Sequence, residues 1–140
     1  MTLLVLFAGF VMGCRSSAVD LPVEGEILVG QGGGFTGLYS GYIVRSDGLV
    51  LRWSQMPGRP EGMEELGRVA ADSLQPFFRR LVVLERQGVR LQGAGNMTAF
   101  LELRTASGRY RLQWGMGEEL PKAVEDLYSE LLQFLRRRLP

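Results

Sequence analysis

An Asp-Gly pair between two β-rich runs is the feature that most restricts how this chain can fold. The runs cover residues 38–45 and 49–53, and Asp47-Gly48 separates them. Such a pair between strand-like runs is the strongest short-range signal for a β-hairpin. We therefore predict an antiparallel hairpin here. The glycine content, 19 of 140 residues, is typical of strands that are joined by tight turns.

Further runs extend this pattern on both sides. Ser107-Gly108 separates residues 97–105 from residues 110–114 and predicts a second hairpin. Apolar and polar residues alternate in this hairpin, so it should bury one face only. Residues 26–29 and 64–69 are predicted as short strands.

Two segments have apolar residues three and four positions apart, which is the spacing of one helical face. In the first, Asp72 or Ser73 can cap the helix, Pro76 falls in its first turn, and Gly88 can end it. Its apolar face consists of Leu74, Phe77, Phe78, Leu81 and Leu84. The second helix starts near Pro121, and its apolar stripe consists of Val124, Leu127, Tyr128, Leu131 and Leu135. The order hairpin, helix, hairpin, helix predicts an α+β fold, with an antiparallel sheet of about four to five strands and two helices packed on one face.

The N-terminal segment has a different character. Residues 2–13 carry no charge and precede Cys14, the only cysteine. The apolar run is too short to span a bilayer but suits the apolar region of a secretory signal. Val11-Met12-Gly13-Cys14 resembles the lipobox of bacterial lipoproteins. The alternative is an ordinary buried N-terminal strand or helix with a chance cysteine.

The lipobox resemblance implies a processing route and an address. Residues 1–13 would be removed as a signal peptide, and Cys14 would carry acyl chains such as palmitate. Residues 14–25 would form a lipidated tether, followed by a single α+β domain over residues 26–138. In this family an Asp after the cysteine retains the protein at the inner membrane. Here Arg15 follows, which implies the outer membrane, with the domain facing the periplasm.

Residue types that are missing restrict the chemistry. The chain has no histidine, which removes Ser-His-Asp and Cys-His mechanisms and the common histidine-ligated zinc sites. The net charge of +1 argues against a nucleic-acid binder. We predict no enzyme activity, metal or cofactor. Glu102 is the one acid inside a strand pattern, and a surface ion pair with Arg104 explains it. Trp53 and Trp114 are predicted to pack in the core or at its rim.

A glycine-rich segment is the candidate binding site. It consists of Gly32, Gly33, Gly34, Phe35, Thr36 and Gly37. The spacing matches the dinucleotide-binding glycine motif, but that motif must open a helix, whereas a strand is predicted at residues 38–45. We interpret the segment as a loop whose exposed Phe35 meets a partner. The alternative is a mobile or tightly turned loop that only connects two strands.

The order of these features carries a family resemblance. Residues 32–37, Tyr42-Ile43-Val44, Gly95-Asn96-Met97, Trp114-Gly115 and the helix over residues 121–135 resemble small bacterial exported proteins and lipoproteins that have no established activity. Gly33-Gly34-Phe35-Thr36-Gly37 and the paired Phe77-Phe78 also resemble emfourin, the small protein inhibitor of the metallopeptidase protealysin. This second resemblance implies a shared fold and, more weakly, peptidase inhibition.

These observations lead to one expectation and two alternatives. We expect a lipoprotein of the cell envelope that is anchored to the bilayer through Cys14 and binds a protein partner, with a peptidase as the candidate. The first alternative is a structural envelope lipoprotein without a discrete ligand. The second, less favoured, is a carboxylate-dependent hydrolase.

Overall fold

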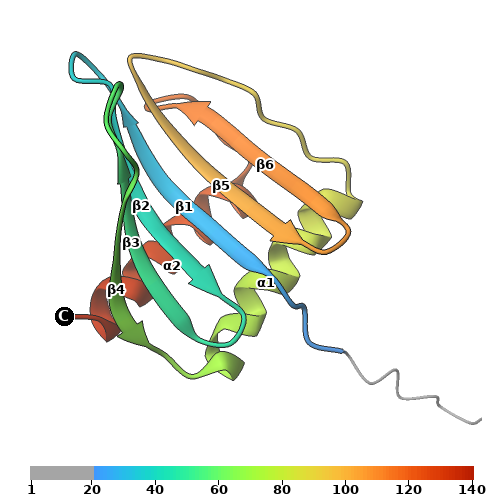
Figure 1. Ribbon diagram of the computed structural model, residues 1–140. Coiled ribbons are helices and arrows are strands. Elements are labelled where there is room, and N and C mark those ends of the chain that lie inside the picture. Colours follow the sequence, from blue (N-terminus) through green and yellow to red (C-terminus); the bar gives the residue numbers. More distant parts are fainter. Residues whose placement is uncertain (1–20) are drawn as a thin grey trace, which may run out of the picture.

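The first four strands of the chain pair with one another in chain order, and the last two strands extend the sheet on the other side of the first strand. The computed structural model describes residues 21–140 (Figure 1). The elements are β1 (Glu26–Gly33), β2 (Leu38–Arg45), β3 (Leu49–Gln55), β4 (Gly62–Arg68), α1 (Ala71–Arg86), β5 (Met97–Thr105), β6 (Gly108–Gly115) and α2 (Lys122–Arg138). One six-stranded sheet has the order β4-β3-β2-β1-β5-β6, and every pair is antiparallel. β1 therefore lies between β2 and β5.

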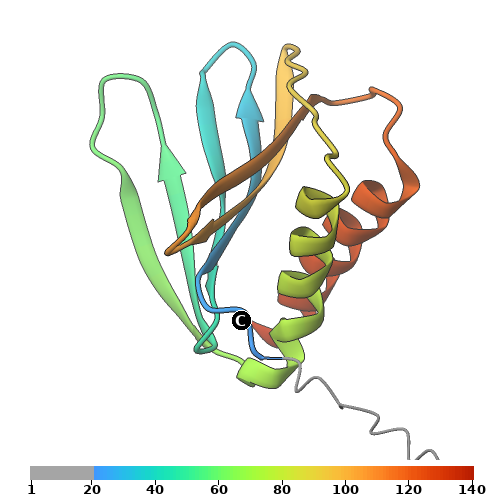
Figure 2. The same cartoon turned by 90° about the vertical axis from the view of Figure 1, so that its right-hand side faces the viewer.

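Both helices cover the same face of the sheet, as Figure 2 shows. The main core lies between these two layers. Its fully buried side chains include Ile27, Val29, Leu74, Phe78, Leu81, Leu101, Leu112, Leu127, Leu131 and Leu135. Each such side chain contributes about 1.5–3 kcal/mol when it leaves water. The predicted α+β class, with two helices packed on one face of an antiparallel sheet, is confirmed.

The sheet has six strands, more than the four to five expected. The count was low although residues 64–69 were predicted as a short strand, which the structure shows as β4 two residues earlier at its start. The side chains of β4 are mostly exposed and show no apolar alternation. Pairing with β3 holds it in place, with an irregular register between Val50 and Leu51. β1 is also longer than the predicted run over residues 26–29, because it continues through Gly33 while it pairs with both β2 and β5.

The helix ends agree in part with the prediction. Gly88 follows α1 with φ +74, and α2 follows Pro121, both as predicted. α1 begins at Ala71 without a side-chain cap, and the Ser73 hydroxyl donates to the Ala70 carbonyl (2.6 Å). Pro76 consequently lies in the second turn, not the first. Within residues 21–140, neither helix has the length and apolar character that a membrane crossing requires.

The two outer edges of the sheet differ in their hydrogen bonding. Beside β6, the Gln113 N–H donates to the Leu91 carbonyl (3.0 Å), and the Gly93 N–H donates to the Gln113 carbonyl (2.9 Å). This connecting segment occupies part of the β6 edge. The outer edge of β4 has no partner strand among the described residues, and it carries Glu64, Glu65 and Arg68.

The sheet face that no helix covers, here called the open face, is partly buried by its own side chains. Leu28, Ile43, Trp53 and Phe100 form a second apolar cluster there. β5 is therefore buried on both faces over residues 98–103. The prediction that the second hairpin buries one face only is wrong, because Phe100 and Glu102 lie under neighbouring side chains of the open face.

Candidate functional site

The glycine-rich segment lies at the tip of the β1–β2 hairpin. Gly32 and Gly33 belong to β1, so only residues 34–37 form the turn, and β2 follows at Leu38. The predicted loop is therefore two residues too long at its start. Gly34 and Gly37 have φ of +68 and +62, which side-chain-bearing residues rarely adopt. A strand after the motif means that no helix N-terminus is available for a pyrophosphate.

Hydrogen bonds fix the backbone of this turn. The Gly34 N–H donates to the Asn96 carbonyl at the start of β5 (2.5 Å), and the Gly37 N–H donates to the Gly34 carbonyl (3.2 Å). The Thr36 hydroxyl accepts from the Leu38 N–H (3.3 Å). Figure 1 shows this turn beside the β3–β4 turn and the start of β5 at one end of the sheet.

Phe35 is presented to solvent on this fixed turn. Its exposed fraction is 107%, the highest among the large apolar side chains described. Leu38 and Met97 are also exposed close by, and a Cβ on Gly34 would lie 3.3 Å from the Met97 Sδ. We call Phe35, Leu38 and Met97 the tip surface. An aromatic side chain in this position gains free energy when a partner covers it.

The lipidation site predicted at Cys14 lies outside the described residues, as do the signal peptide and most of the tether. The described chain enters the fold at the opposite end from the tip surface. There the side-chain amide of Gln75 accepts from the Val23 N–H (2.9 Å) and donates to the Val23 carbonyl (3.1 Å). This contact holds the chain against α1 just before β1 begins.

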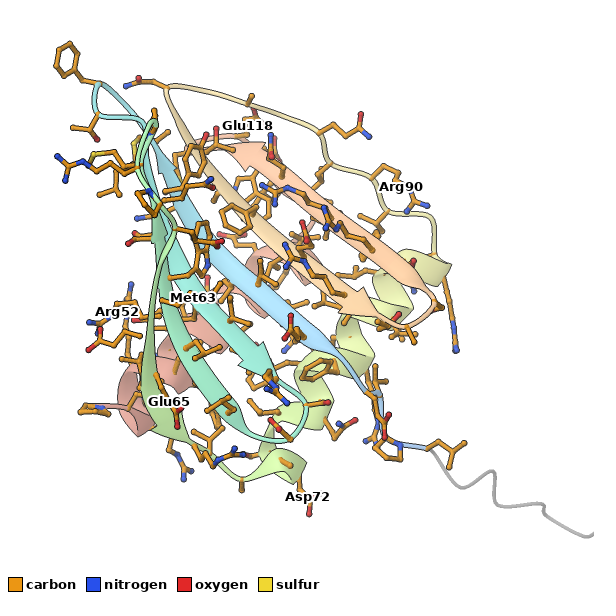
Figure 3. All side chains as sticks on the ribbon, in the orientation of Figure 1. Arg52, Met63, Glu65, Asp72, Arg90 and Glu118 are labelled. Carbon is orange, nitrogen blue, oxygen red and sulfur yellow. The ribbon has the colours of Figure 1, made fainter. Side chains whose placement is uncertain are left out.

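A second group of polar side chains lies on the open face, which Figure 3 views with both helices behind the sheet. Glu102 on β5 is 1% exposed, and three arginines surround it. Arg104 Nε donates to Glu102 Oε1 (2.5 Å), and Arg111 Nη1 donates to Oε2 (3.0 Å). Arg109 Nε lies 3.3 Å from Oε1. The expected surface pair is therefore a buried carboxylate with three cations, which we call the Glu102 cluster.

The charge state of Glu102 follows from opposing effects. Burial raises the pKa of its carboxyl group. Hydrogen bonds from Arg104 and Arg111 and the nearby positive charges lower this pKa, and together they outweigh the effect of burial. The net pKa is below the ordinary value of 4.5. Glu102 is thus ionised at neutral pH, with both oxygens engaged, which is unsuited to a general acid.

Aromatic side chains lie next to the Glu102 cluster. The Trp53 and Phe100 rings have centroids 5.7 Å apart, although their strands are separated by β1 and β2. Across the sheet, Trp53 pairs with Gly41 on β2, and Phe100 pairs with Gly30 on β1. Because both intervening residues are glycines, no side chain separates the two rings. The Arg111 guanidinium lies over the Phe100 ring, 4.3 Å from its centroid.

These side chains enclose one side of a shallow hollow of about 290 Å³. It is lined by Leu28, Tyr39, Trp53, Gln55, Glu61, Phe100, Arg104 and Arg111. Trp53 is 6% exposed, and its Nε1 has no hydrogen-bond partner among the described residues. The hollow thus combines an apolar floor with two guanidinium groups, those of Arg104 and Arg111, and one carboxylate, that of Glu61. Trp114 packs in the main core instead, so both tryptophans pack as predicted.

Sequence reasoning missed this arrangement, although a signal was present. Glu102 and Arg104 alternate on one strand, and Arg109 and Arg111 alternate on the next. Pairing the two runs across Ser107-Gly108 sets Glu102 opposite Arg111 and Arg104 opposite Arg109, as observed. Register reasoning could have found the three arginines, whereas burial of the carboxylate depends on more distant strands.

No family model matches the sequence, and no curated protein matches it. The resemblances to exported lipoproteins and to emfourin stay predictions. Within residues 21–140, no group of three or more His, Cys, Asp or Glu side chains could hold a metal ion.

Proposed function

We propose that this protein is a non-enzymatic, membrane-tethered domain that binds a protein partner through the tip surface. The observation that carries the proposal is the fully exposed Phe35 on a turn fixed by hydrogen bonds. Covering one phenylalanine contributes about 1.5–3 kcal/mol. A turn that is already ordered loses little further conformational freedom on binding, so more of this free energy remains as affinity.

The direction of β1 supports the same proposal. β1 runs from the end where the described chain begins to the turn that carries Phe35 (Figure 1). Its 8 residues extend over about 26 Å. If Cys14 is lipidated, the tip surface faces away from the anchor and reaches a partner that is not itself in the bilayer. The resemblance to emfourin makes a peptidase the candidate partner.

Photo-crosslinking in cells tests the proposal. A photoreactive phenylalanine analogue at position 35 should give a discrete adduct with one envelope protein. The same analogue at position 63 is the control, because Met63 is 59% exposed but lies on β4, outside the tip surface. Excess unlabelled full chain should suppress the position-35 adduct, and the Phe35→Ala chain should not. Equal adducts at both positions, or none at position 35, would rule out the tip surface as the binding site.

An inhibition assay tests the peptidase candidate separately. The full chain in a non-ionic detergent is titrated into protealysin, in parallel with Phe35→Ala. If the partner is a peptidase of this class, Phe35→Ala should weaken inhibition about tenfold or more, the loss expected for a buried aromatic contact. No inhibition by the wild-type chain would remove this candidate, while the crosslinking result would still decide whether the tip surface binds a protein.

A further inference from the structure

The open face carries arginine donors that its own contacts do not use. In the Glu102 cluster, three arginines face one carboxylate, which leaves a net charge of +2. One arginine would already neutralise Glu102. Glu26 lies opposite Arg104 on β1, but no ion pair joins the two residues within the described part of the chain. Glu26 and Glu61, the acid that lines the hollow, together offset this +2, so the free donors of Arg104, and not a net charge, mark the site.

Arg104 is the arginine with the most free hydrogen-bonding capacity at the hollow. Its Nε is held by Glu102, and its two terminal nitrogens have no hydrogen-bond partner among residues 21–140. The buried carboxylate therefore orients a guanidinium group whose outer donors remain available. Two such donors match the two oxygens of a carboxylate or a phosphate.

The remaining lining of the hollow is suited to an apolar group. Leu28, Trp53 and Phe100 form its floor, Tyr39 stands at its side, and the polar residues Gln55 and Glu61 complete the lining. A volume of about 290 Å³ lies at the lower end of the range for ligand sites. It fits a small molecule or the last residue of a peptide.

We infer that this hollow, separate from the tip surface, binds an organic anion that carries a carboxylate on an aromatic or branched apolar body. The carboxylate accepts from the two terminal nitrogens of Arg104, and the apolar body lies against Trp53 and Tyr39. Arg111 is held by Glu102 and Gln113 and adds positive charge. The anion can be a free small acid or the C-terminal residue of a peptide, because both present this chemistry.

NMR of the indole N–H groups tests the inference on the full chain in a non-ionic detergent. The chain has 2 tryptophans, so Trp53 reports on the hollow and Trp114, in the main core, is the internal reference. N-acetylphenylalanine should shift the Trp53 indole signal with saturation near about 1 mM or below, and its uncharged amide should bind about tenfold more weakly. No saturable shift, or equal binding of the amide, would overturn the inference.

Two arginine variants provide a matched pair. Arg104→Gln and Arg109→Gln remove the same charge beside Glu102, but only Arg104 lines the hollow. Arg104→Gln should weaken binding of N-acetylphenylalanine about tenfold, and Arg109→Gln should weaken it by less than about threefold. An unchanged Trp114 signal shows that each variant is folded. Equal weakening by both variants would mean that general charge attracts the probe, and would overturn the site.

Two further arms identify the source of the anion and separate this site from the proposed function. A tripeptide with a C-terminal phenylalanine carboxylate should bind more tightly than N-acetylphenylalanine if the natural ligand is a peptide end. It should bind equally or more weakly if the ligand is a free acid, and both results support the site.

Phe35→Ala should leave probe binding unchanged, because the tip surface takes no part in it. A loss of probe binding in Phe35→Ala would contradict two separate sites.

Discussion

Glu102 determines where three arginine side chains lie on the open face. A buried carboxylate is stable only when its charge and its oxygens are satisfied, and Arg104, Arg109 and Arg111 provide this. The arginines are each more than a third exposed, so their positive charge remains partly available to solvent. One residue thus connects the buried part of the open face to its charged surface.

The stability that Glu102 contributes should depend on pH in a defined direction. Its pKa in the folded protein is lowered, so the contribution is complete above the ordinary value of 4.5 and is lost as the pH falls through the folded pKa. Glu102→Gln should reduce the free energy of unfolding by about 1–3 kcal/mol at pH 7. We expect this deficit to shrink in strongly acidic solution, as measured by urea unfolding followed by circular dichroism.

Glu65→Gln is the matched control for this measurement. Glu65 also lies on a strand of the sheet, but it is exposed and forms no ion pair among the described residues (Figure 3). Its substitution should change the free energy of unfolding by less than about 0.5 kcal/mol at either pH. A deficit for Glu102→Gln that stayed constant into strong acid would show that charge is not the source of its effect.

Among the elements, the first three strands show best what the sequence could and could not predict. The Asp47-Gly48 turn and the strands beside it were predictable, because a turn residue with positive φ and the flanking β-rich runs are local signals. The extension of β1 through Gly32 and Gly33 was not predictable from local signals, because glycine disfavours strands. It forms because pairing with β2 and β5 on both sides outweighs that local preference.

The tip of the β1–β2 hairpin should also be coupled to the β3–β4 turn through Gly37. A Cβ on Gly37 would lie 2.9 Å from the Pro57 Cγ, whereas a Cβ on Gly58 would meet nothing within 4 Å. Both glycines have positive φ, +62 and +73. Gly58→Ala should therefore lower the free energy of unfolding by about 1 kcal/mol through backbone strain alone. Gly37→Ala should lower it by about 1 kcal/mol more through the added clash.

Urea unfolding of the two alanine variants measures this difference directly, and each variant is the other's control for backbone strain. Equal losses would mean that Pro57 moves freely, and that the two turns are independent of each other.

For the whole molecule, the sequence predicts the class more completely than it predicts the site. Helical and strand periodicities are local, so the α+β class and the common helix-covered face could be predicted. The open face depends on β5 pairing with β1, which brings Phe100 over two glycines toward Trp53. No local pattern contains that long-range pairing, and the hollow was missed for this reason.

The proposed membrane tether concerns the whole chain and leads to its own prediction. A lipidated cysteine with several acyl chains gives a stable anchor. Cys14→Ser should therefore move the protein from the membrane fraction to the soluble fraction and abolish palmitate labelling. Ser16→Ala, two residues away, should change neither. A Cys14→Ser protein that still labelled with palmitate and still sedimented with membranes would contradict lipidation at this residue.

The outer edge of β4 has a consequence at high surface density. If the chain is anchored as proposed, its copies diffuse in two dimensions, where collisions between neighbours are frequent, and an unpaired strand edge is a template for copy-to-copy pairing. The irregular register beside Leu51 and the charges of Glu64, Glu65 and Arg68 make such pairing unfavourable. Because the segment beside β6 occupies part of the other edge, we expect crowded copies to remain separate instead of joining into filaments.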